Sequence, residues 1–183
     1  CGNVTEIQSL VEVKDFKAPT PVCDEITEVA VSSNGIAVSF AEDYDDGSTD
    51  NCGVCDFEIK RSDQSDITFA PNITFDCNDF NVMVTLRVYD CVGNFNDCMI
   101  EVNVDDKIAP TCVAPPNTMI PCAEIPADID LENIDFMNDN FGTPTFNDNC
   151  NAIINYLPVV NTTNICGEGL LVRGFQAEDT RGN

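Results

Sequence analysis

Aspartates and cysteines are the residues of this sequence whose types and spacing could do chemistry. The densest acidic stretch reads Glu-Asp-Tyr-Asp-Asp-Gly-Ser-Thr-Asp-Asn over residues 42–51. Calcium takes about six to eight oxygen ligands, and clustered carboxylates beside a glycine turn could supply them. The spacing is not that of an EF-hand loop, and a solvated acidic loop is the alternative. We predict a calcium site here with the ligands Asp43, Asp45, Asp46 and Asp50.

Cysteine supplies the second candidate chemistry, because the chain has 11 cysteines among 183 residues. The pair Cys52-Gly-Val-Cys55 has three interpretations. A zinc knuckle would need a second pair at similar spacing, which the sequence lacks. A thioredoxin-like redox motif would need a βαβ setting, which the residue pattern does not offer. Disulfides formed in an oxidising compartment are the interpretation that the count favours.

The composition argues against several classes of function. With 32 Asp+Glu, 8 Lys+Arg and a formal net charge of −24, the chain should repel nucleic acid and anionic lipid. It has no histidine, which removes Ser-His-Asp and Cys-His nucleophiles and imidazole-bound metal. No apolar run approaches the ~20 residues of a membrane-spanning helix, so we expect no membrane insertion. An acid pair of the glycosidase kind could be drawn from the 32 carboxylates. These acids lie in turns and linkers, however, so we expect no enzyme.

An internal repeat of about 90 residues organises the chain. Residues 2–19 align without a gap with residues 93–110, and residues 179–183 match residues 90–94. Cys1 then belongs to the turn of an earlier module, with an acylated lipoprotein terminus as the alternative. We expect residues 1–17 to be the last strand of a preceding module. Two modules then follow, over 18–106 and over 107–183, the second truncated before its last strand.

The residue pattern within a module is that of β structure. Alternating apolar residues over 82–89 and 100–104, on either side of a Gly-Asn turn, predict a hairpin over 82–104. One helical turn is expected within 128–137. Further strands are expected over 28–31, 36–40, 57–61, 67–69, 152–160 and 169–177. About seven short strands in each module of ~90 residues indicate an all-β fold of tandem immunoglobulin-like Greek-key β-sandwiches.

Several motifs resemble those of hyalin repeat (HYR) modules. The pattern Val-x-Val-x-Asp-x-x-Ala-Pro at 102–110 follows an Asp-x-x-Gly-Asn turn at 90–94. Residues 46–53 (DGSTDNCG) and 84–90 (VTLRVYD) are similar to HYR-like repeats of giant surface adhesins of gliding Bacteroidota. Residues 142–150 (GTPTFNDNC) resemble a second subtype of such repeats.

The resemblance implies an immunoglobulin-like fold and a stalk or filament at the cell surface. Many proteins with such repeats are exported by type IX secretion and serve gliding, attachment or prey capture. The chain departs from the pattern at Thr180-Arg181, where these repeats often carry a cysteine.

The resemblance, taken with the expected strand positions, also implies a set of disulfides that staple the sandwiches. Cys112 and Cys122 either bridge one another or have partners outside this sequence. Six cysteines alone allow about 15 connectivities, so the pairs are hypotheses. The implied pairs are Cys23–Cys98, Cys52–Cys77, Cys55–Cys91 and Cys150–Cys166.

A second calcium site is predicted where successive modules meet. Asp15 and Asp105-Asp106 precede the two Ala-Pro linkers, and Asp90 and Asn94 belong to the turn nearby. A cation bridging Asp15, Asp90, Asp105 and Asp106 would stiffen the linker and offset part of the negative charge. Asp148-Asn149 repeats the Asp50-Asn51 pair without the aspartates upstream, so we expect a weaker site there.

These features predict a structural and adhesive repeat segment of a long extracellular protein, used for attachment, gliding or contact with prey or substrate. Its expected partners are neighbouring modules, an unidentified surface ligand and other copies in a filament. The alternative is a secreted β-sandwich module that binds carbohydrate or protein, although the chain has no tryptophan and three tyrosines. Three sequons are candidate glycosylation sites, at Asn3, Asn72 and Asn161.

Overall fold

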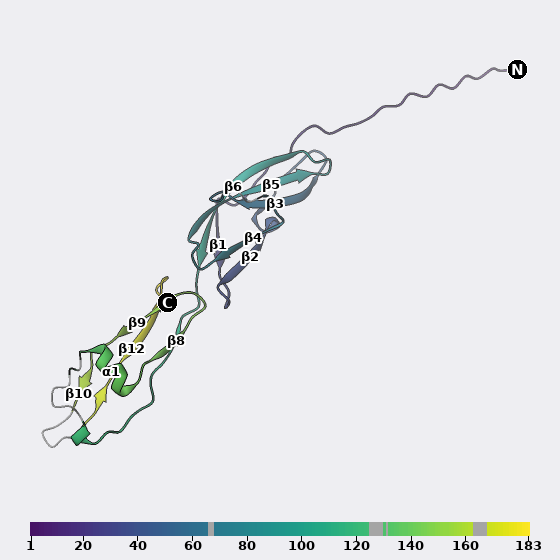
Figure 1. Ribbon diagram of the computed structural model, residues 1–183. Coiled ribbons are helices and arrows are strands. Elements are labelled where there is room, and N and C mark those ends of the chain that lie inside the picture. Colours follow the sequence, from purple (N-terminus) through teal and green to yellow (C-terminus); the bar gives the residue numbers. More distant parts are fainter. Residues whose placement is uncertain (66–67, 125–129, 131, 163–167) are drawn as a thin grey trace. The chain divides into compact units, whose positions relative to one another are not determined.

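Two compact units make up the chain in a computed structural model (Figure 1). The model describes every residue except 66–67, 125–129, 131 and 163–167. Unit 1 consists of Cys1–Thr27, Val38–Ile73 and Asn81–Asn103. Unit 2 consists of Glu28–Ala37, Thr74–Phe80 and Val104–Asn183.

Strands dominate the described residues, as the all-β prediction requires. No helix among these residues has the length and apolar character needed to cross a membrane. The first half of the chain contains β1 (Ile26–Ala30), β2 (Ile36–Phe40), the 3-10 turn η1 (Ala41–Tyr44), β3 (Val54–Arg61), β4 (Asn72–Asp76), β5 (Asn81–Asp90) and β6 (Phe95–Asp105). The second half contains β7 (Thr111–Val113), η2 (Cys122–Glu124), α1 (Ile134–Phe141), β8 (Thr145–Asn147), β9 (Ala152–Tyr156), β10 (Val160–Asn161), β11 (Leu171–Val172) and β12 (Phe175–Asp179).

The largest sheet has four strands in the order β1-β6-β5-β3, and β2 pairs with β4 in a second sheet. Strands β5 and β6 form the predicted hairpin, with Val82 opposite Val102 and Val84 opposite Ile100. The turn between them contains Gly93, whose φ of 95° is a conformation that glycine adopts without strain. The hairpin therefore brings the end of β5 close to the start of β6.

Alternation along β5 builds the apolar core of unit 1. Val82, Val84, Leu86 and Val88 are almost completely buried, while the residues between them are more exposed. This is the two-residue period of a strand with one face on the core. The core is completed by Ile59, Ile100, Val102 and Tyr44.

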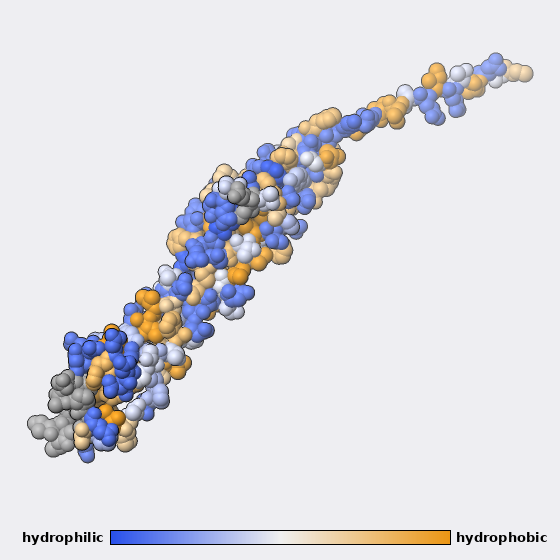
Figure 2. Space-filling view, in the orientation of Figure 1, coloured by the Kyte–Doolittle hydropathy of each residue, from blue (hydrophilic) through white to orange (hydrophobic). Residues whose placement is uncertain are grey.

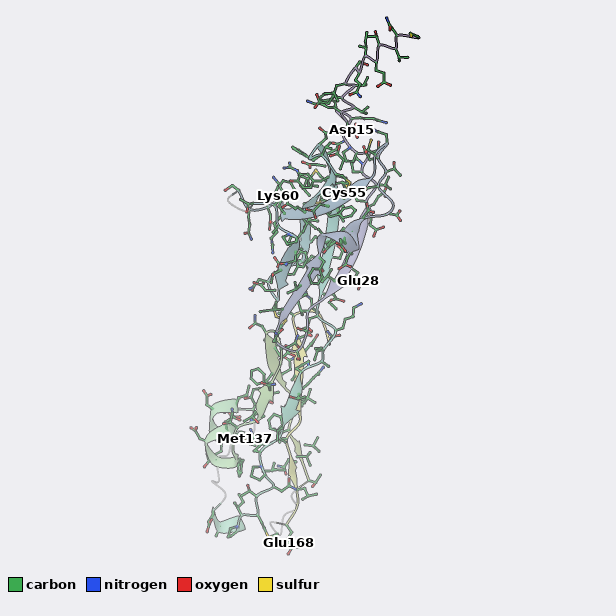
Figure 3. The ribbon with its side chains drawn as sticks, turned by 90° about the vertical axis from the view of Figure 1, so that its right-hand side faces the viewer. Asp15, Glu28, Cys55, Lys60, Met137 and Glu168 are labelled. Carbon is green, nitrogen blue, oxygen red and sulfur yellow. A yellow bond between two sulfur atoms is a disulfide. The ribbon has the colours of Figure 1, made fainter. Side chains whose placement is uncertain are left out.

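Unit 2 has much less apolar core over its longest segment. Within the described residues of 107–183, Met137 is the only hydrophobic side chain classed as buried, and it lies on α1 (Figure 3). The short strands there form the pairs β7–β8, β9–β12 and β10–β11. Helix α1 begins at Asn133, whose side chain accepts a hydrogen bond from the backbone N–H of Phe136. Apolar burial alone therefore stabilises this segment weakly.

Most expected strands occur near their predicted places, with shifted ends. The expected strands 28–31, 36–40 and 57–61 correspond to β1, β2 and β3, and the stretches 152–160 and 169–177 each divide into two strands. The helical turn expected within 128–137 becomes α1, which begins later and runs further. The strand expected over 67–69 falls partly outside the described residues. Strand β4 was not predicted, because its Asn and Asp residues are typical of turns.

Candidate metal centres

Among the described residues, three disulfides link strands and turns. The structure joins Cys23 to Cys98 and Cys55 to Cys91, the two pairs predicted for these cysteines, with Cα–Cα distances of 6.5 and 5.1 Å. A third disulfide joins Cys77 to Cys150 over a Cα–Cα distance of 5.5 Å. Disulfides form and persist in oxidising compartments, so these bonds indicate a non-cytoplasmic environment.

The third disulfide corrects the other two predicted pairs. The predictions Cys52–Cys77 and Cys150–Cys166 assumed that each bond stays within one repeat. Instead, the turn after β4 places Cys77 beside Cys150, and one cysteine can form only one disulfide. Cys52 is an exposed free thiol. Cys166 lies outside the described residues. Cys112 is also free and exposed, as is Cys1.

In the part of the chain that the structure describes, six aspartates form two clusters of three carboxylates. In each cluster, one oxygen of every carboxylate lies within 4.8 Å of the others. Cluster 1 consists of Asp15, Asp50 and Asp90, which all belong to unit 1, and Figure 3 labels Asp15 where the N-terminal segment meets the strands of that unit. Cluster 2 consists of Asp106, Asp148 and Asp179, which all belong to unit 2.

Three segments that are distant in sequence build cluster 1. Asp15 comes from the linker, and its carboxylate accepts hydrogen bonds from the N–H of Lys17 at 3.0 Å and from the amide of Asn51 at 3.1 Å. Asp50 accepts a bond from the N–H of Cys52 at 2.7 Å. Asp90, at the end of β5, closes the turn before β6. It accepts bonds from the N–H groups of Val92 and Asn94 and from the amide of Asn94.

Cluster 2 is built in the same way from the following repeat. Asp106, just after β6, accepts hydrogen bonds from the N–H of Ile108 at 3.0 Å and from the amide of Asn149 at 2.9 Å. Asp148 accepts a bond from the N–H of Cys150 at 3.1 Å. Asp179, at the end of β12, accepts bonds from the N–H groups of Arg181 and Asn183 and from the amide of Asn183.

Seven hydrogen bonds of cluster 1 have a counterpart in cluster 2. The six bonds to carboxylates described for cluster 1 each have a counterpart in cluster 2. A seventh pair joins the turn to the linker backbone: the Asn94 amide donates to the Asp15 carbonyl at 3.4 Å, and the Asn183 amide donates to the Asp106 carbonyl at 2.6 Å. The sequence repeat is therefore also a repeat of one polar arrangement, which holds three acidic side chains together.

Hydrogen bonds keep these carboxylates in their charged form. Burial alone would raise the pKa of Asp90 and of Asp179, because it disfavours the charged state. The amides of Asn94 and Asn183, with the N–H groups of each turn, outweigh that effect and hold both pKa values below 3.8. The pKa of Asp15 is also lowered, chiefly by the backbone N–H two residues further on. Asp15, Asp90 and Asp179 are therefore negatively charged at neutral pH.

The acidic stretch predicted as one site divides in the structure. Asp50 groups with Asp15 and Asp90 and not with its neighbours in sequence. Asp43 accepts a hydrogen bond from the N–H of Phe40, and Asp45 accepts bonds from the N–H groups of the following turn. These two carboxylates thus shape their own loop, while Asp46 is exposed.

The predicted linker site also divides. Asp15 and Asp90 belong to cluster 1, whereas Asp106 belongs to cluster 2. Asp105 stands apart, with one oxygen 3.9 Å from the Lys107 ammonium. Asp179 was missed as a site residue, and Asp148 was expected only in a weaker site. The signal for both was present, since Asp179 aligns with Asp90 in the repeat and Asp148-Asn149-Cys150 repeats Asp50-Asn51-Cys52.

The candidate glycosylation residues Asn3, Asn72 and Asn161 are all exposed.

The chain matches no protein-family model, and no curated protein shows significant sequence similarity to it.

Proposed function

We propose that this chain is a structural and adhesive segment of a long protein on the outside of a cell. Its repeats are immunoglobulin-like modules of the HYR-like kind, used in attachment, gliding or contact with prey or substrate. The observation that carries the proposal is the duplicated polar arrangement. A protein built from serial repeats would contain such copies, in which the same hydrogen bonds join a linker, a loop and a turn.

The strand order supports an immunoglobulin-like module. In such sandwiches the third, sixth and seventh strands form one sheet, and the second and fifth strands pair in the other. The order β3-β5-β6, with β2 paired to β4, matches this arrangement if one edge strand is missing. Strand β1 lies beside β6, where a first strand that changes sheets would lie.

The N-terminal segment supports a serial arrangement. In the repeat alignment, Val11 and Val13 correspond to Val102 and Val104 of β6. The two β6 residues are 0% and 3% exposed, whereas Val11 and Val13 are 79% and 91% exposed. Figure 2 shows hydrophobic and hydrophilic residues mixed along this thin segment. Such a pattern fits a strand whose own sheet belongs to another repeat.

The covalent and electrostatic properties support a place outside the cell. The three disulfides of the described residues add stability to a small β-fold, which suits extracellular modules. A net charge of −24 keeps a long chain soluble and separated from other anionic polymers. Type IX secretion is the export route that the HYR-like resemblance suggests.

Labelling of intact cells tests the location. Antibodies raised against this chain should label cells of the source organism without permeabilisation. Brief treatment with an external protease should remove the signal, while a cytoplasmic protein stays intact as the control. Labelling that needs permeabilisation would contradict the proposal.

Deletion of the gene tests the adhesive role separately. Mutant cells should attach to surfaces or spread less than the parent, and a plasmid copy should restore both properties. Unchanged attachment and spreading would count against an adhesive role, even if the protein lies at the surface.

A further inference from the structure

Both clusters concentrate negative charge, and within the described parts of the chain no basic side chain neutralises it. Across the described residues, none of the six aspartates forms an ion pair with a lysine or arginine. Carboxylates this close repel one another, and partial burial strengthens the repulsion by lowering the local dielectric constant. Because the arrangement occurs twice despite this electrostatic repulsion, we expect a further interaction that compensates for it.

Unpaired buried oxygens show where that interaction is missing. Asp106 is 3% exposed, and its Oδ2 atom is buried without a hydrogen-bond partner. The same holds for Oδ1 of Asp148 and for Oδ1 of Asn149. In cluster 1 the corresponding atom of Asp50 is again buried and unpaired. Buried polar atoms almost always have a partner, so a recurring exception at equivalent atoms points to a ligand.

The surrounding hydrogen bonds leave these oxygens free for that ligand. In each loop, one oxygen of the aspartate is held by the N–H of a cysteine, and the other oxygen has no partner. In cluster 2, both bonds to Asp106 use Oδ1 and leave Oδ2 unused. The backbone therefore positions the carboxylates before any ligand arrives, which reduces the entropy lost on binding.

We propose that clusters 1 and 2 are two equivalent calcium sites. The ligands are Asp15, Asp50 and Asp90 in one site, and Asp106, Asp148, Asp179 and the side-chain oxygen of Asn149 in the other. Every donor is a hard oxygen atom, which suits calcium and not the metals that prefer nitrogen or sulfur. Cys150, which follows Asn149 in cluster 2, is already in a disulfide, and the free Cys52 thiol of cluster 1 forms a hydrogen bond with Asp15. Magnesium demands a small, near-octahedral shell and keeps much of its water, so it fits a multi-carboxylate site less well.

Calcium in these sites would join segments that are far apart in sequence. Each ion would hold the linker aspartate to a loop aspartate and to the aspartate that ends a strand. The linker could then leave its repeat in one direction only. This inference deepens the proposed function, because a stiff linker suits a surface stalk, but the binding itself depends only on the chain.

Calorimetric titration of the full chain tests the assignment. After treatment with EGTA and desalting, the disulfide-bonded chain should bind two calcium ions, and cluster 2 should bind more tightly because it has more unpaired oxygens. Asp148→Asn should remove the tighter site, and Asp50→Asn should remove the weaker one. Asp46→Asn removes the same charge from an exposed residue outside both clusters and should keep both sites.

Three results would overturn the proposal. These are no calcium binding at millimolar concentration, two unchanged sites in both cluster variants, or a loss of binding in Asp46→Asn. Magnesium binding as tight as calcium binding would refute the choice of metal. Circular dichroism checks that each variant is folded, and limited proteolysis of the unmodified chain with and without calcium gives a readout that needs no variant. Surface labelling of cells is independent of these outcomes, so the two proposals can fail separately.

Discussion

Clusters 1 and 2 share seven corresponding hydrogen bonds but have different surroundings. In cluster 2, the amide of Asn149 donates to the Ser32 carbonyl at 3.3 Å, and Cys150 is bonded to Cys77. In cluster 1, the equivalent Cys52 is an exposed thiol. The linker aspartate differs accordingly, since Asp106 is buried and Asp15 is half-buried. A local motif can therefore assemble the carboxylates, but other segments decide how deeply they are buried.

Removal of calcium should change the stability of the chain more than any other treatment that we propose. Because the clusters differ in burial, we expect them to contribute unequally to this change. Calcium at ~100-fold above its Kd adds about 3 kcal/mol of stability per site, so removing it from both sites with EGTA should lower the melting temperature by roughly 10–20 °C. Scanning calorimetry with and without EGTA measures this change. Equal melting in both conditions would show that neither cluster binds calcium.

A variant of one cluster separates calcium binding from a purely structural role. Its effect on the melting temperature should depend on whether calcium is present, which a structural role would not produce. With calcium, Asp148→Asn should melt at a lower temperature than the unmodified chain. Without calcium it should melt at the same or a higher temperature, because the substitution relieves repulsion and keeps the hydrogen bond from the N–H of Cys150. Destabilisation in both conditions would indicate a structural role alone.

The disulfide beside cluster 2 should influence calcium affinity at that cluster only. Replacing both Cys77 and Cys150 by serine should cost about 2–4 kcal/mol and weaken calcium binding at cluster 2 by roughly tenfold. A double serine variant of Cys23 and Cys98 is the matched control, since its sequence separation is 75 against 73. The control should lose similar stability and keep both affinities. If both double variants lost the same calcium affinity, the Cys77–Cys150 disulfide would have no specific effect on cluster 2.

Gly35 packs closely against Asn149 and Cys77 beside cluster 2, and a substitution there should have a smaller effect. A Cβ atom there would lie 2.6 Å from the Asn149 carbonyl oxygen and 2.9 Å from the Cys77 sulfur. We expect Gly35→Ala to cost about 2–4 kcal/mol, from the strained φ and the overlap together. Gly47 also has a positive φ but has open space around it, so Gly47→Ala should cost only about 1–2 kcal/mol. Urea denaturation measures both, and equal costs would argue against close packing at Gly35.

The smallest effect is expected at the exposed cysteine of cluster 1. Cys52→Ser should change stability by less than about 0.5 kcal/mol, because the thiol is exposed and not in a disulfide. Iodoacetamide should label Cys52 in the native chain at alkaline pH, because the hydrogen bond to Asp15 raises the pKa of this thiol, and it should reach Cys150 only after reduction. Mass spectrometry after digestion reads out both sites, and protection of Cys52 would show that cluster 1 is also covered.

Local pattern was sufficient for the hairpin of β5 and β6, because alternating apolar residues and a Gly-Asn turn specify it within the 25 residues from Asn81 to Asp105. The pairs Cys23–Cys98 and Cys55–Cys91 came instead from the HYR-like resemblance taken with the expected strand positions, and both join elements of one repeat. Local pattern was insufficient for Cys77–Cys150, because nothing near either cysteine in sequence indicates its partner. For the same reason, the sequence did not predict that Asp50 would group with Asp15 and Asp90. Proximity in sequence favoured Asp43 and Asp45, whose carboxylates instead bind their own loop.

By itself, the sequence determined the repeat, the β pattern and the identity of the acidic and sulfur groups. These follow from residue type and spacing, which act over a few neighbours. Only the tertiary structure decided which aspartates meet, which oxygens lack a partner and which cysteine closes over cluster 2. Those features depend on segments that are ~35–75 residues apart, and strand pairing and core packing bring them together.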